Sequence, residues 1–83
     1  MTYAIVWEEA ALNAAPRFLE DDAEGLRRLM DAVDLLAQEP RPDGTVEYGS
    51  PDLRRMYVGR YRVVYEITDN TVTVVVMHLG RTG

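Results

Sequence analysis

The stretch from Arg54 to Arg81, RRMYVGRYRVVYEITDNTVTVVVMHLGR, decides the fold of this chain. It contains three runs rich in valine and tyrosine, which are typical of β-strands, separated by Gly59-Arg60 and Asp69-Asn70. Gly59-Arg60 suits a two-residue type II′ turn with glycine first, and Asp69-Asn70 suits a type I′ turn because both residues tolerate positive φ. We therefore predict three antiparallel strands joined by two hairpins.

These two turns also predict a strand register, which sorts the side chains onto two faces. Tyr57 is expected opposite Arg62, and Arg62 opposite Met77 on the third strand. One face is then nearly continuous and apolar, and it comprises Met56, Val58, Tyr61, Val63, Tyr65, Val74, Val76 and His78. The other face displays Arg55, Tyr57 and Arg62, with Arg81 on the same side. A bulge of one residue would exchange these assignments.

The segment before this stretch indicates a strand followed by two helices. Residues 2–7 (TYAIVW) are rich in β-forming side chains, and residues 8–19 indicate a helix with Leu12, Ala15 and Leu19 on one side. Pro16 is expected to kink or break that helix, because proline removes a backbone hydrogen bond.

A second helix is predicted from a cap at Asp21 or Asp22 to about Gln38, where Pro40 stops it. Its apolar residues recur at helical spacing, and they are Leu26, Leu29, Met30, Val33 and Leu36. Residues 39–51 hold three of the four prolines and indicate a loop with a short extended piece. The predicted class is α+β, with two N-terminal helices packed on a small antiparallel sheet in the order β-α-α-β-β-β.

Length and composition limit the functions to consider. At 83 residues, the chain is expected to form a single domain over residues 1–83. It has no cysteine and one histidine, so neither a metal site nor a cofactor is expected. It shows neither a basic, then apolar leader nor a run of about 20 apolar residues, so we expect a cytoplasmic protein.

Charge is divided unevenly along the chain. Residues 1–51 hold eleven acidic residues and four arginines, whereas residues 52–83 hold three and five, which divides the net charge of -5 into -7 and +2. Lysine is absent, so every positive side chain is a guanidinium, which suits forked contacts with phosphate or carboxylate. The predicted sheet is therefore the basic part of an acidic protein.

Four side chains on the polar sheet face form the candidate site, namely Arg55, Tyr57, Arg62 and Arg81. Converging guanidinium groups bind a phosphodiester or a carboxylate, and an aromatic hydroxyl among them can stack on a base or exchange a proton. The alternative is a solvated face whose arginines pair with Glu47, Asp52 or Glu66, and the pattern alone favours it.

His78 also has two interpretations. An imidazole transfers protons near neutral pH, which makes His78 a candidate acid-base group. The predicted register places it opposite Tyr61 on the helix-covered face, where a hydrogen-bonded core histidine is the commoner outcome.

The order of these elements, with GRYRVVYEI at residues 59–67, resembles the RelE/ParE superfamily of toxins from bacterial toxin-antitoxin pairs. The most specific match is G-x-Y-R-V-V-Y at residues 59–65, and LLAQEPRP at residues 35–42 resembles the usual end of the second helix. The resemblance implies an antitoxin partner that wraps around the toxin. In the RelE branch it also implies metal-independent cleavage of mRNA in the ribosomal A site, through attack of the ribose 2′-hydroxyl on the adjacent phosphate. The ParE branch instead inhibits DNA gyrase.

The resemblance also implies roles for single residues. Arg62 would neutralise the scissile phosphate, Arg81 would supply a second charge, and Arg55 occupies a position that is often basic. Tyr57 or His78 would then move protons. Relatives often carry lysines that act in catalysis, and they often carry a tyrosine or histidine in a tail beyond the last arginine. This sequence has neither feature.

The sequence pI of the chain is near 4.7, which is unusually low for a protein that binds RNA. A gyrase inhibitor and a catalytically weak antitoxin-binding member therefore stay as alternatives.

Overall fold

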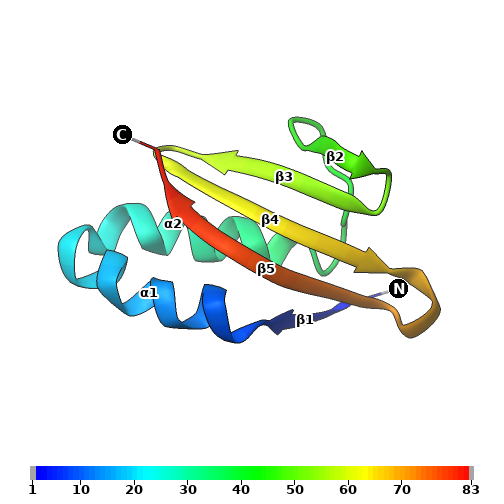
Figure 1. Cartoon of the computed structure of the whole chain (residues 1–83), viewed down its shortest axis with the longest axis horizontal. Helices are drawn as coiled ribbons and strands as arrows, with labels where there is room; N and C mark the ends of the chain where they lie inside the picture. Colours follow the sequence, from blue (N-terminus) through cyan, green and yellow to red (C-terminus); the bar gives the residue numbers. More distant parts are fainter. Residues whose placement is uncertain (1, 83) are drawn as a thin grey trace.

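A five-stranded sheet forms one layer of the molecule and two helices form the other (Figure 1). The computed structural model describes residues 2–82. The strands are β1 (Ala4–Trp7), β2 (Val46–Ser50), β3 (Leu53–Val58), β4 (Tyr61–Thr68) and β5 (Thr73–Arg81), and the helices are α1 (Glu9–Asp21) and α2 (Ala23–Leu35). Both helices lie against the same face of the sheet, so its other face is open (Figure 1).

The predicted α+β class with two N-terminal helices is confirmed, and the sheet has one more strand than expected. Its strand order is β1-β5-β4-β3-β2. The first strand pairs with β5 in parallel, so the sheet is mixed, whereas the other three pairings are antiparallel. The short extended piece expected in the loop of residues 39–51 is β2, which forms one edge.

Helix α1 differs from its prediction in two ways. It runs through Pro16 without a break. Its buried residues are Ala11 and Ala14, whereas Leu12 and Leu19 are about half exposed. The small alanine side chains allow α1 to lie close to the sheet, and the larger leucines are left on its outer side.

Helix α2 begins and packs as predicted. The side chain of Asp22 accepts a hydrogen bond from the backbone N–H of Gly25 at 3.1 Å, which caps the helix. The face against the sheet contains Leu26, Leu29 and Val33, all buried. Among residues 2–82, neither helix is long and apolar enough to cross a membrane.

The hairpin between β3 and β4 is confirmed. Val58 pairs with Tyr61 around Gly59-Arg60, and Gly59 has a φ of 58°. This positive φ at the first turn position alone fits the predicted type II′ turn. Tyr57 lies opposite Arg62, as the turn predicted.

The connection from β4 to β5 is different from the predicted two-residue turn. Residues 69–71 form a short 3₁₀ helix and Val72 adopts the left-handed conformation, so that Thr68 pairs with Thr73 across a four-residue loop. A bulge follows, because Tyr65 pairs with Val76 but Val64 pairs with His78, which leaves Met77 as the extra residue.

The bulge exchanges the faces of the residues that follow it. Leu79 is buried under the helices, where His78 was predicted, and His78 is exposed. Arg62 lies opposite Gly80 rather than Met77, and Tyr61 lies opposite Arg81. The predictions that His78 is a core residue and that Arg81 shares a face with Arg62 are therefore wrong.

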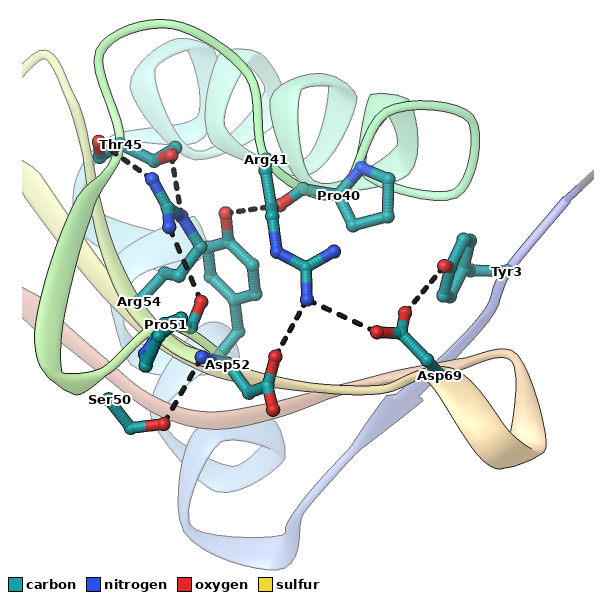
Figure 2. Close-up of polar contacts among 10 residues, drawn as sticks. Tyr3, Pro40, Arg41, Thr45, Ser50, Pro51, Asp52, Arg54 and Asp69 are labelled. Atoms are coloured by element: carbon teal, nitrogen blue, oxygen red, sulfur yellow. Dashed lines mark hydrogen bonds and ion pairs between the residues drawn. The ribbon is translucent and has the colours of Figure 1, made fainter.

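A cluster of polar contacts holds the loop after α2 against the far end of the sheet (Figure 2). Arg41 donates to Asp52 at 2.7 Å and to Asp69 at 3.3 Å, and Tyr3 donates to Asp69 at 2.7 Å. The hydrogen bond from Tyr3 lowers the pKa of Asp69, which Arg41 lowers further. Beneath this cluster, the buried Tyr65 hydroxyl donates to the carbonyl of Pro40 at 2.7 Å.

Candidate functional site

A hollow of about 510 Å³ lies on the open face of the sheet. Strands β2 to β5 all contribute to it, and Glu8, which follows β1, completes it. Its lining residues are Glu8, Tyr48, Leu53, Arg55, Arg62, Val64, Met77 and His78. Two guanidinium groups, one imidazole and one carboxylate therefore share a single hollow.

Arg62 and His78 approach each other above Gly80. A methyl group at Gly80 would lie 3.1 Å from Nε2 of His78 and 3.7 Å from a terminal guanidinium nitrogen of Arg62. The two side chains reach this point because Arg62 pairs with Gly80 and the bulge turns His78 outward. A fixed cation and a group able to carry a proton thus lie at one place, as general acid-base chemistry on a phosphate requires.

Arg55 is held between aromatic side chains instead of being paired with a carboxylate. The central carbon of its guanidinium lies 5.0 Å from the ring centre of Tyr48 and 5.6 Å from that of Tyr57. Its Nε atom is buried and has no hydrogen-bond partner among residues 2–82. A buried donor without a partner is costly in free energy, so the arrangement around Arg55 is not explained by hydrogen bonding to its Nε.

The ion pairs that would have neutralised this face do not form among the described residues. Neither Arg55 nor Arg62 pairs with a carboxylate in residues 2–82. Asp52, one of the expected partners, pairs with Arg41. The two guanidinium groups in the hollow therefore form no ion pair within the described residues, and Glu8 is the carboxylate that shares the hollow with them.

Arg81 lies on the helix side of the sheet, away from the hollow. Its guanidinium pairs with Asp21 at the end of α1 and lies 5.2 Å over the ring of Phe18. The hydrogen bond to Asp21 raises the pKa of Arg81. Phe18 also meets Tyr61 edge to face at 5.4 Å, so Arg81 belongs to the contact between α1 and the sheet.

Tyr57 lies on the open face but does not line the hollow. Its contact there is with Arg55, as described above. Among the lining residues with a polar group, Glu8 and Tyr48 were not predicted from the sequence. Tyr48 stands two residues after Val46 in a β-forming run, a pattern that indicates one face of a strand, whereas no sequence pattern indicates that Glu8 enters the hollow.

A second hollow, of about 340 Å³, lies between the outer sides of the two helices. We call it the helix groove, and it is lined by Leu12, Ala15, Pro16, Leu19, Leu26, Arg27 and Met30. Leu12 and Leu19 both line the groove and are 55% and 51% exposed, so the groove has an exposed apolar surface. The apolar side that the sequence predicted for the first helix therefore lines a groove instead of the core.

This two-layer arrangement is the RelE-like fold of bacterial toxins. A RelE variant from E. coli with two arginines replaced by alanine, in the free state, matches with a TM-score of 0.81 at 24% identity, over 98% of this chain and 84% of that chain. The RelE-RelB complex from Pyrococcus horikoshii matches with a TM-score of 0.79 at 24% identity, over 100% and 98%. The intact RelBE toxin-antitoxin complex from E. coli matches with a TM-score of 0.73 at 26% identity, over 98% of both chains.

Residues 5–83 match the family described as the ParE toxin of type II toxin-antitoxin system, parDE. The chain therefore belongs to this family of toxins, within the RelE/ParE superfamily that the G-x-Y-R-V-V-Y run predicted. Among curated proteins, none matches the chain.

Proposed function

We propose that this toxin cleaves mRNA in the ribosomal A site, without a metal ion, in the hollow on the open face of the sheet. The observation that supports this proposal is that Arg55 and Arg62, neither of which pairs with a carboxylate within residues 2–82, line one hollow with the imidazole of His78. Residues 1–83 would act as one domain, and the reaction would take place in the cytoplasm, where mRNA is translated.

The reaction needs charge stabilisation and two proton transfers. The ribose 2′-oxygen bonds to the adjacent phosphorus while the bond from phosphorus to the 5′-oxygen of the next nucleotide breaks. One proton leaves the 2′-hydroxyl and another is delivered to the departing 5′-oxygen. Arg62 and Arg55 stabilise the charge on the pentavalent phosphate, and His78 carries one of the two protons.

Arg81 and Tyr57 contribute indirectly in this proposal. Arg81 ties the end of β5 to α1 through Asp21, and β5 carries both His78 and Gly80. Tyr57 holds the guanidinium of Arg55. Both are positioning residues, because neither lines the hollow.

Replacing Arg62 tests the proposal directly. Expression of the parent in bacterial cells is expected to arrest growth and to create new mRNA 5′ ends at codon spacing. Arg62→Ala should lower this cleavage by about 100-fold or more, the usual effect of removing a group that stabilises a transition-state charge. Arg60→Ala is the matched control, because Arg60 lies in the adjacent turn and pairs with Asp22 away from the hollow. A folded Arg62→Ala protein that cuts like the parent would contradict the proposal.

The family match favours a second candidate function, inhibition of DNA gyrase. It predicts growth arrest with intact mRNA, together with inhibition of supercoiling by the purified toxin. A third outcome, tight antitoxin binding without growth arrest, would identify a catalytically inactive member.

We further propose that the cognate antitoxin covers the helix groove with an apolar helix. RelE proteins of the same fold from E. coli and P. horikoshii are known in complex with RelB. The exposed leucines of the groove give such a helix the apolar contacts on which helix-in-groove recognition depends.

Leu19→Glu places a charge in the groove and should weaken antitoxin binding by at least about tenfold, because burial of an unpaired charge is costly. Leu35→Glu is the control, since Leu35 is 65% exposed and lines a different surface, near Pro42 and Met56. Titration calorimetry with the purified antitoxin measures both variants. Equal losses, or no loss for Leu19→Glu, would place the antitoxin elsewhere.

A further inference from the structure

We infer that Tyr48 is a stacking platform for one nucleobase of single-stranded RNA, beside a phosphate held by Arg55 and Arg62. The inference rests on the proposed function for its RNA substrate, and it assigns a binding role to the edge strand β2.

Tyr48 combines three properties of a base-stacking residue. It lines the hollow together with both guanidinium groups. Its side chain is 49% exposed, although a large aromatic residue is usually more buried. One side of its ring faces the guanidinium of Arg55 at 5.0 Å, which fixes the orientation of the ring before any ligand binds.

The chemistry of the hollow favours a nucleotide over an acidic peptide. A nucleotide presents an anionic phosphate and a flat aromatic ring on one small scaffold. The hollow offers an exposed aromatic ring and two guanidinium groups that form no ion pair in the part of the chain that the structure describes. Arg55 lines the hollow next to Tyr48, so its guanidinium group is a donor for the phosphate. An acidic side chain would satisfy the guanidinium groups but leave the exposed ring without a partner. Stacking tolerates any base, since each has a π-face.

Tyr57 provides an internal comparison. It also contacts Arg55, at 5.6 Å, and is equally exposed at 50%, but it does not line the hollow. If Tyr48 acted only by holding Arg55, replacement of either tyrosine would have the same effect. If Tyr48 stacks on a base, only its replacement should remove the contribution of the base.

The test is an NMR titration of the ¹⁵N-labelled full chain with adenosine 5′-monophosphate and, in parallel, with ribose 5-phosphate, which lacks the base. The parent should bind the nucleotide at least about fivefold more tightly, as stacking on an aromatic side chain provides. Its adenine protons should shift upfield. Tyr48→Ala should remove both effects, whereas Tyr48→Phe and Tyr57→Ala should keep them.

Three results would overturn the inference. The first is equal affinity of the parent for both ligands, and the second is an unchanged preference in Tyr48→Ala. The third is no binding of either ligand at millimolar concentration. Dispersed spectra establish that each variant is folded.

The same variants separate this inference from the proposed function. If the nucleotide and ribose 5-phosphate bind with equal affinity but Arg62→Ala still abolishes mRNA cleavage, only the role of Tyr48 is wrong. If the base is bound but mRNA stays intact in cells, the proposed nuclease function is wrong and the nucleotide site remains.

Discussion

Gly80 lies beside both Arg62 and His78, and it shows how one residue without a side chain shapes the hollow. The two functional groups lie within 4 Å of where its Cβ would be. A methyl group there would be 3.1 Å from Nε2 of His78, which is closer than ordinary contact, but His78 is exposed and can move. We infer that glycine is used at this position for space.

Gly80→Ala should therefore affect activity and stability in opposite directions. Alanine in a strand is favoured over glycine by about 0.5 to 1 kcal/mol, so thermal stability should stay level or rise slightly. mRNA cleavage should fall by about tenfold or more, since small displacements of catalytic groups are costly. Thermal unfolding and mapping of mRNA 5′ ends measure the two effects.

A double variant shows whether the methyl group acts through the imidazole. Gly80→Ala combined with His78→Ala should cleave no more slowly than His78→Ala alone, because the displaced group is already absent. Full activity of the single Gly80→Ala variant would mean that the arrangement of Arg62 and His78 does not matter for cleavage.

At the scale of the elements, α2 and the β3–β4 hairpin could be predicted because their signals are local. The cap at Asp22 and the spacing of Leu26, Leu29 and Val33 define the helix. Gly59 supplies the positive φ that defines the turn. The same hairpin placed Arg55, Tyr57 and Arg62 on one face, as the structure has them.

The register of β5 could not be predicted, because its sequence lacks alternation. Residues 74–77 are apolar at every position, so both faces of the strand satisfy the pattern equally. The bulge at Met77 is selected by tertiary packing, which buries Leu79 beneath the helices. The one-residue bulge therefore places His78 in the hollow and Arg81 on the helix side of the sheet.

Helix α1 presents a similar ambiguity. Ala11 and Ala14 define one apolar side, and Leu12 and Leu19 define another. Hydrophobicity favours burial of the leucines, whereas close packing against the sheet requires the small residues. The sequence of one chain does not show that the leucine side is left exposed.

For the whole molecule, the fold pairs several carboxylates with arginines that lie outside the hollow. Acidic residues at the end of α1 pair with cations from the other half of the chain, Asp21 with Arg81 and Asp22 with Arg60. Arg41 is paired with Asp52 and Asp69. Arg55 and Arg62 line the hollow and form no ion pair within residues 2–82, so a negative net charge coexists with two unpaired guanidinium groups on one face of the sheet.

Two carboxylates at opposite ends of the molecule are expected to make its stability depend on pH in the acidic range. Asp22 receives hydrogen bonds from Gly25 and Tyr61, the second at 3.0 Å, and Asp69 receives them from Tyr3 and Arg41. The N–H of Gly25, then the Tyr61 hydroxyl, lowers the pKa of Asp22, just as Tyr3 lowers that of Asp69.

A lowered pKa in the folded state means that the unfolded chain takes up protons first as the pH falls. The stabilisation is therefore complete above the ordinary aspartate pKa of about 4 and is lost as the pH falls through the lower folded values. We expect the free energy of unfolding, measured by urea denaturation, to decrease as the pH falls below about 4. Asp22→Asn with Asp69→Asn should flatten this decrease, and asparagine can still cap α2. Asp31→Asn, on the exposed side of α2, is the control and should keep the parent's slope. If the free energy of unfolding falls with pH equally steeply in the parent and in the double variant, neither carboxylate causes the pH dependence.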